Sequence, residues 1–217
     1  MNPLLLIISA LIALVLALHS ARRIRWDILR AHPHTLHIFF ATSLILTLLA
    51  MMRIGTQSGL SLHLCGITAA TLIMGRRLAL LAGLLAQTLL AASGITAWSH
   101  WGINALCFAT LPAYVSYGFC RLLQRLLPHN PFVFTLGAGF FGGIVTLAAV
   151  MLSVSLLSYA NALHDWPTIW HKYLKFLPVI IYPEGFLNGV IITAMVAFHA
   201  EQISCFNPHS YFNHRKK

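Results

Sequence analysis

Long apolar runs alternate with short polar connectors along the whole chain. We expect seven membrane-spanning helices from these runs, at residues 3–18, 36–52, 59–74, 78–92, 103–126, 132–159 and 183–200. A helix rises about 1.5 Å per residue, so roughly 20 residues are needed to cross a hydrocarbon core of about 30 Å. Because the third and fourth runs are shorter than that, we expect them to form a hairpin that lines a cavity.

The composition is that of an integral membrane protein. Apolar residues make up 59% of the chain, charged residues only 8%, and the mean hydropathy is +0.80. Together with the repeated apolar runs, these values predict an all-α polytopic protein with a single membrane domain over residues 1–217. The first run follows no basic segment and precedes no small-residue cleavage site, so we interpret it as a retained span rather than a signal peptide.

The basic residues lie in the connectors and set the expected orientation. If the N-terminus is outside, seven spans place the C-terminus inside, and eleven basic residues then lie on the inner side against three on the outer side. The inner ones are Arg22, Arg23, Arg25, Arg30, Arg76, Arg77, Arg121, Arg125, Arg215, Lys216 and Lys217, and the outer ones are Arg53, Lys172 and Lys175. Cytoplasmic loops carry such an excess, so we expect an N-out, C-in protein of the bacterial plasma (inner) membrane. The net charge of +10 therefore reflects topology and does not indicate nucleic-acid binding.

A histidine in the small-residue run from Gly59 to Gly75 is the first candidate for a functional site. An imidazole is costly to place in hydrocarbon, so we interpret His63 as a site residue. The alternative is a histidine at a helix mouth that only hydrogen-bonds a backbone carbonyl. Cys65 behaves more often as a small apolar residue than as a ligand. The four cysteines have no paired spacing, so we expect neither a disulfide nor a cysteine zinc site.

The expected orientation divides the remaining histidines into two groups. Those at or near the outer side are His100, His164 and His171, together with the acidic residues Asp165 and Glu184. A site that takes up a cation from outside should use this outer group. The AHPHTLH tract lies on the inner side and is interrupted by Pro33, so we interpret it as the polar start of a helix.

Three segments together resemble the membrane-embedded substrate-capture component of cobalt/nickel energy-coupling-factor transporters, the CbiM/NikM type. They are SGLSLHLCGITAATLIMGRRLALLAGLLAQTLL, GINALCFATLPAYVSYGF and PEGFLNGVIITAMVAF, which span roughly residues 58–198. The positions that match the family pattern are His63, Gly66, Ala69, Ala70, Gly75, Gln87, Asn104, Glu184 and Gly185. The resemblance implies the helical bundle of an energy-coupling-factor S-component.

The resemblance also implies a metal site, with one departure. In the family, the free amine and a second-residue histidine join the helix histidine, but here Asn2 stands at the second position. His63 is then the main expected ligand, with the amine of Met1 and the imidazoles of His100 or His164 as further donors. Two residues have alternative roles. Glu184 would either orient His63 or cap the start of its own helix, and Asn104 would either hydrogen-bond a metal ligand or satisfy the start of its helix.

The function implied is that of the substrate-binding permease component for uptake of Ni(II) or Co(II), with no tightly bound cofactor. We find no ATP-binding motif, no H-E-x-x-H and no nucleophile paired with a base, so we expect no enzyme activity. A coupling transmembrane (T) subunit and ATPase subunits are the implied partners, and the face that carries Ala69 and Ala70 is expected to contact them. The alternatives are a carrier for a small organic cation or vitamin, or a non-transporting membrane assembly factor.

Overall fold

The computed structural model describes residues 2–27, 33–57, 59–208 and 211. The helices are α1 (Pro3–Arg22), α3 (Pro33–Met51), α4 (Ile67–Ala92), α5 (Trp101–Ala105), α6 (Leu111–Leu126), α7 (Pro131–Val133), α8 (Gly142–Ala160), α9 (Trp166–Lys172) and α10 (Leu177–His199). Wider π-helical segments join α5 to α6 at Leu106–Thr110 and α7 to α8 at Phe134–Phe141. Short 3-10 turns lie at Trp98–His100, Leu174–Phe176 and Ala200–Gln202. The expected all-α membrane architecture is confirmed, apart from one small β-hairpin.

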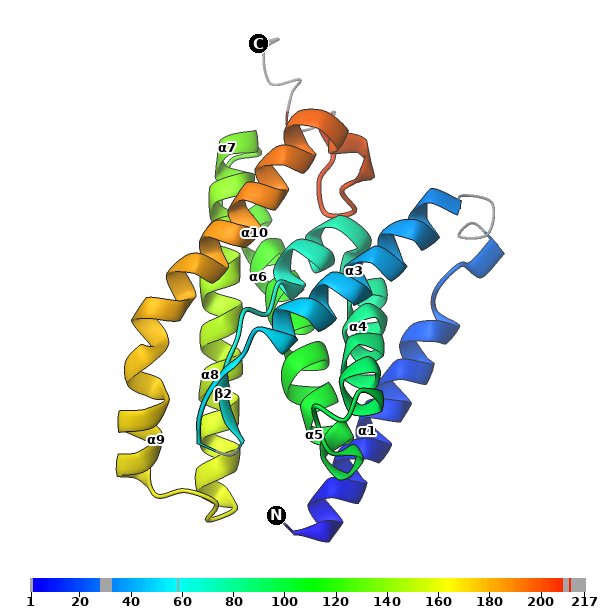
Figure 1. The fold of residues 1–217 in the computed structure, drawn as a ribbon. Helices are drawn as coiled ribbons and strands as arrows, with labels where there is room; N and C mark the ends of the chain where they lie inside the picture. Colours follow the sequence, from blue (N-terminus) through cyan, green and yellow to red (C-terminus); the bar gives the residue numbers. More distant parts are fainter. Residues whose placement is uncertain (1, 28–32, 58, 209–210, 212–217) are drawn as a thin grey trace.

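Six stretches are long and apolar enough to cross a membrane. They are Pro3–Arg22, His34–Met51, Ile67–Ala92, Trp98–Leu126, Pro131–Ala160 and Trp166–Gln202. The start of α1 and the end of α10 lie at opposite ends of the bundle (Figure 1). A chain that starts at one end of the bundle and finishes at the other must run through it an odd number of times. Six stretches give an odd number because the third folds into a hairpin and runs through the bundle in both directions.

The third stretch is a helical hairpin rather than one straight helix. Gly75 has φ +78° and ψ 159°, which is outside the helical region and breaks α4 into two arms. The side chain of Ile67 comes within 2.8 Å of the position that a Cβ on Gly83 would occupy. In a straight helix these residues would lie about 24 Å apart along the axis. The two arms are therefore antiparallel, as expected for the hairpin of residues 59–92.

The expected helix over residues 59–74 is wrong in its first half. Strands β1 (Ile54–Gln57) and β2 (Leu60–Leu62) form an antiparallel hairpin, and helix begins only at Ile67. Glycines cause the difference, because Gly59 and Gly66 have φ values of +82° and +63°, which a right-handed helix does not permit. His63 therefore lies in an irregular segment between β2 and α4.

The last span is longer than expected. Helix α10 begins at Leu177 rather than near residue 183, and Pro183 lies inside it. Neighbouring helices in membrane proteins can satisfy the backbone carbonyl that a proline leaves free. Glu184 is consequently an interior residue of α10 rather than its first residue, which changes the interpretation of its role below.

Small residues bring the last helices close together. A Cβ on Gly185 would lie 2.9 Å from the backbone oxygen of Phe140, and a Cβ on Gly143 would lie 3.2 Å from the Cα of Gly185. Glycine at these positions permits the backbones of α10 and α8 to pack directly on each other. This packing brings the buried side chains of Glu184 and Asn188 toward α4.

Candidate metal centre

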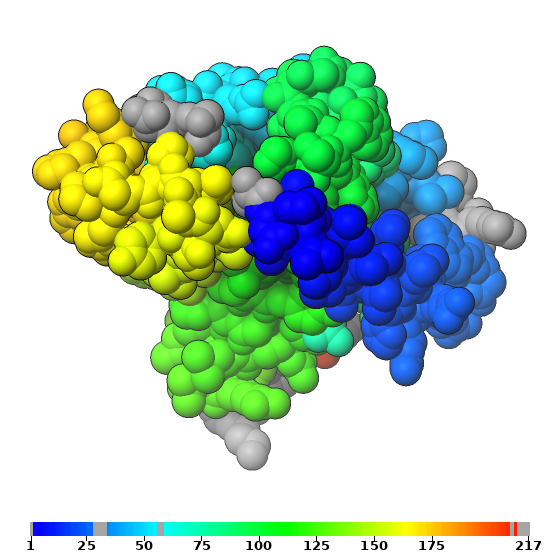
Figure 2. Space-filling view, turned by 90° about the horizontal axis from the view of Figure 1, so that it is seen from below, coloured from blue at the N-terminus to red at the C-terminus, as the bar shows by residue number. Residues whose placement is uncertain are grey.

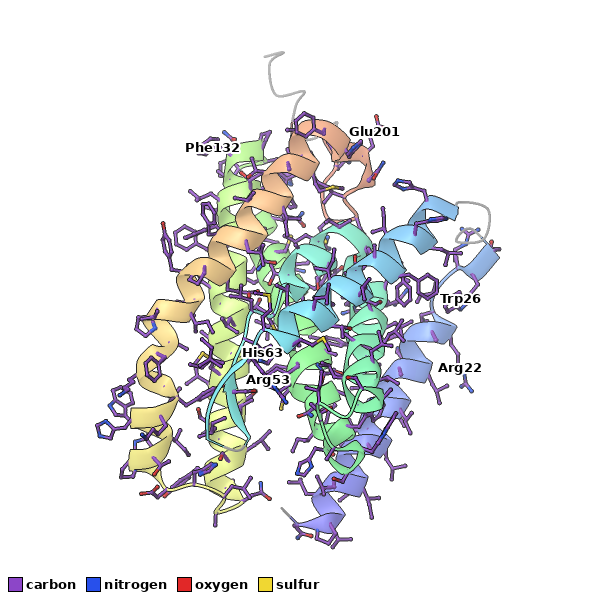
Figure 3. The ribbon with its side chains drawn as sticks, in the orientation of Figure 1. Arg22, Trp26, Arg53, His63, Phe132 and Glu201 are labelled. Atoms are coloured by element: carbon purple, nitrogen blue, oxygen red, sulfur yellow. The ribbon has the colours of Figure 1, made fainter. Side chains whose placement is uncertain are left out.

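His63 lies beside the β-hairpin and close to Arg53, and the residue as a whole is partly buried (Figure 3). Its ring faces Phe108, with ring centroids 4.9 Å apart and planes tilted by 48°. Nδ1 of His63 is buried and has no hydrogen-bond partner among the described residues. A buried polar atom without a partner needs an explanation, and a bound ion is one of the few available.

The environment of His63 keeps its imidazole neutral. Burial, with a smaller contribution from the charge of Arg53, lowers the pKa of His63 to about 4, and the nearby backbone of Ser61 offsets only part of this effect. Arg53 itself is held by a hydrogen bond from Nη2 to the carbonyl of Ile95, 2.7 Å long. At neutral pH the ring therefore has a free lone pair, which is the form that binds metal ions.

Two small cavities meet at His63. The first is lined by Ser61, Leu62, His63, Phe108, Leu147, Val150, Met151, Tyr173 and Ile180, and the second by Leu46, Ala50, His63, Leu64, Cys65, Ile67, Gly83, Ala86, Gln87 and Phe108. Both linings are mainly apolar. The side-chain amide of Gln87 is the strongest additional donor in the second cavity, and the second arm of α4 positions it there.

A carboxylate on α10 anchors the segment that carries His63. Glu184 is fully buried, and its Oε2 and Oε1 accept hydrogen bonds from the backbone N–H groups of Cys65 (2.7 Å) and Gly66 (2.8 Å). Asn188 donates from Nδ2 to Oε1 of Glu184 (2.7 Å) and accepts from the N–H of Ala69 (2.7 Å). The N-terminal N–H groups of a helix need such partners, and Gly66 has no side chain to supply one. The start of α4 is therefore capped from α10.

This geometry decides between the two expected roles of Glu184. The expectation that Glu184 caps its own helix is wrong, because α10 begins two turns earlier at Leu177. Its hydrogen bonds go to the backbone two and three residues after His63 rather than to the imidazole. Glu184 thus positions His63 through the chain, and its charge lies at the positive end of the α4 dipole.

The structure does not bring the other candidate ligands to His63. His100 is exposed in the 3-10 turn Trp98–His100 and contacts Ser99, and His164 lies in the connection between α8 and α9. Neither residue lines either cavity. Across the described ranges, no group of three or more His, Cys, Asp or Glu residues could hold a metal ion.

Two further expectations concern the N-terminus and Asn104. Met1 lies outside the described residues. The Oδ1 atom of Asn2 accepts a hydrogen bond from the N–H of Leu4 (3.0 Å) and so caps α1. Seen from the N-terminal side, the first residues of α1 lie between the yellow segment that includes α9 and the green segment near α5 (Figure 2).

Asn104 lies in α5, one turn before Phe108, and lines neither cavity.

The expected partner surface on the third span is also wrong. Ala69 and Ala70 are 3% and 4% exposed, and Asn188 accepts a hydrogen bond from the backbone of Ala69. Their small side chains therefore serve packing inside the molecule, where the first arm of α4 meets α10.

Comparisons with known proteins agree with the fold. Residues 1–202 match the CbiM family model, described as "Cobalt uptake substrate-specific transmembrane region". The solved structure "Crystal Structure of an transition metal transporter" is similar, with a TM-score of 0.66, 18% identity, and coverage of 91% of this chain and 88% of that chain. The solved structure "Crystal Structure of an Truncated Transition metal Transporter" is also similar, with a TM-score of 0.68, 18% identity, and coverage of 94% of this chain and 96% of that chain.

At this identity the two structures support the fold alone, and no protein with curated annotation matches the sequence. The family match covers nearly the whole chain. The protein is therefore a multi-pass membrane protein of the CbiM family, the substrate-specific transmembrane region of cobalt uptake.

Proposed function

We propose that this protein captures Ni(II) or Co(II) from the outer side of the membrane and that His63 is the main ligand. The observation that carries the proposal is the buried Nδ1 of His63, which has no hydrogen-bond partner in the described part of the chain and adjoins two cavities. An imidazole nitrogen is a suitable donor for both metals. The membership of the chain in the CbiM family supports a metal over a vitamin or another organic cation.

The remaining ligands of the proposed site come from two sources. Gln87 lines the cavity next to His63 and offers an amide oxygen. The amine of Met1 is the second proposed donor, because the free amine is part of the site in the family that the sequence resembles. We propose that the N-terminal segment reaches the cavity when metal is bound. Asn2 would then offer its backbone nitrogen to the metal, because it lacks the imidazole that the family has at this position.

Transport against a gradient requires an energy source that this sequence lacks. The chain contains no phosphate-binding loop, so ATP hydrolysis must come from other subunits. We propose that a coupling transmembrane subunit and an ATPase pair form the complete energy-coupling-factor transporter with this protein, and that no cofactor is permanently bound.

Calorimetry with the purified full-length protein tests the proposal. We expect Co(II) and Ni(II) to bind the wild type, His63→Ala to abolish binding, and His100→Ala to leave it unchanged. His100 is a matched control because it is exposed and lines neither cavity. Binding that survives His63→Ala, or a wild type that binds neither metal, would refute the proposed ligand.

A further inference from the structure

The chain folds back across α4 after the end of α10. The N–H of Ser204 donates to the carbonyl of Ile73 (2.9 Å), and the N–H of Cys205 donates to the carbonyl of Leu72 (3.1 Å). These carbonyls belong to the last turn of the first arm of α4, which Gly75 terminates, so they need partners from elsewhere. Backbone hydrogen bonds therefore hold Cys205 against the last turn of the first arm of α4. The segment that follows α10 lies at the same end of the bundle as the end of α10 (Figure 1).

A second cysteine meets Cys205 from α6. The thiols of Cys120 and Cys205 are neighbours in one packed cluster, and Sγ of Cys205 donates a hydrogen bond to the carbonyl of Thr71 (3.8 Å). One turn further along α6, Gln124 donates from Nε2 to the carbonyl of Cys205 (2.6 Å). Cys120 is 1% exposed, whereas Cys205 is only partly buried. The two sulfur atoms are thus paired on fixed backbones and can be reached from the side of Cys205.

The chemistry of this pair differs from that of His63. The described residues offer no third His, Cys, Asp or Glu that could complete a larger metal site here. Two thiolates without further donors suit a soft cation that accepts low coordination, such as Cu(I).

We propose that Cys120 and Cys205 form a dithiolate site for a soft monovalent cation of the Cu(I) type, separate from the site at His63. Binding displaces the two thiol protons and forms two sulfur–copper bonds, with no change in oxidation state. The two sites lie at opposite ends of the first arm of α4, which has eight residues and is therefore about 12 Å long. This site does not depend on the function proposed for His63.

An anaerobic competition titration tests the proposal. Purified full-length protein in detergent is titrated against the Cu(I) complex of bicinchoninate, with ascorbate present to keep the copper reduced. We expect the wild type to remove about one Cu(I) per chain from the chelator, and both Cys120→Ser and Cys205→Ser to lose this ability. Cys107→Ser is the matched control, because Cys107 is also buried but lies outside the cluster that contains Cys120 and Cys205.

Two further measurements keep the test decisive. Gel filtration and Co(II) calorimetry of each serine variant report whether the fold is intact. X-ray absorption at the copper edge of the wild type should show two sulfur neighbours, which does not depend on any variant folding. The proposal is overturned if the wild type does not compete for Cu(I), if Cys120→Ser retains the copper, or if the copper edge shows nitrogen neighbours instead of sulfur.

Discussion

Replacing Glu184 with glutamine tests how the His63 segment is held. The carboxylate of Glu184 accepts three hydrogen bonds in a fully buried position, from Cys65, Gly66 and Asn188. A glutamine of the same shape keeps one oxygen, but its amide group then points a donor at the N–H of Cys65 or Gly66. At least one buried N–H loses its partner, and the remaining hydrogen bonds lose their charge.

The size of the effect follows from these contacts. An unsatisfied buried donor costs about 1–3 kcal/mol, and hydrogen bonds to charged groups are worth about 1.5–3 kcal/mol each against about 1 kcal/mol for neutral ones. We therefore expect Glu184→Gln to destabilise the protein by about 3 kcal/mol. Metal affinity should fall by roughly 10- to 100-fold, the usual effect of losing a group that orients a metal ligand.

Thermal unfolding in detergent and metal calorimetry on the same preparations measure both effects. Glu201→Gln is the control, because Glu201 is an exposed glutamate in the turn after α10 (Figure 3). The reasoning is refuted if Glu184→Gln unfolds at the same temperature and binds metal with the same affinity as Glu201→Gln.

Three further predictions follow from the structure. Gly66→Ala should lower the unfolding temperature, because Gly66 has φ +63° and a Cβ there would lie 2.8 Å from Cδ1 of Leu49. The expected loss of stability is about 1–2 kcal/mol or more, and an unchanged unfolding temperature would contradict the backbone geometry. The ring of His63 should remain neutral at pH 6 and take up a proton only near its pKa of about 4, so protons should compete with metal at this ring below about pH 5. Nitrogen NMR of histidine-labelled protein, with His63→Ala to assign the signal, measures the titration, and a midpoint near 6.5 would refute the prediction. A cysteine introduced at the exposed Asp27, in a background without the other cysteines, should not react with an impermeant maleimide added from outside, because the connector after α1 is expected in the cytoplasm. Rapid modification would show that the orientation is the opposite of the one expected.

The pattern of apolar residues predicts most of the bundle. The spans near residues 36–52, 103–126 and 132–159 agree with helices to within a few residues, because each is a long apolar run with a clear polar boundary. The hairpin turn at Gly75 was also predictable, since Gly-Arg-Arg separates two runs too short to cross a bilayer alone.

The surroundings of His63 could not be predicted in the same way. Glycines are common in membrane helices, so sequence alone does not reveal that Gly59 and Gly66 adopt positive φ and that helix begins only after Gly66. The anchor at Glu184 depends on contacts across 118 and 119 residues of chain, which no local pattern encodes. Asn188 could be suspected from its spacing, because it lies one turn after Glu184 on the same face of α10.

Anomalous diffraction from crystals grown with Co(II) tests the central claim most directly. Data collected on both sides of the cobalt absorption edge would locate the metal without any substitution in the protein. We predict one strong anomalous peak beside Nδ1 of His63, at about 2.1 Å, in the cavity that Gln87 and Phe108 line. A peak that lies elsewhere in the molecule, or no peak at His63 in crystals that contain cobalt, would contradict the assignment of His63 as the metal ligand.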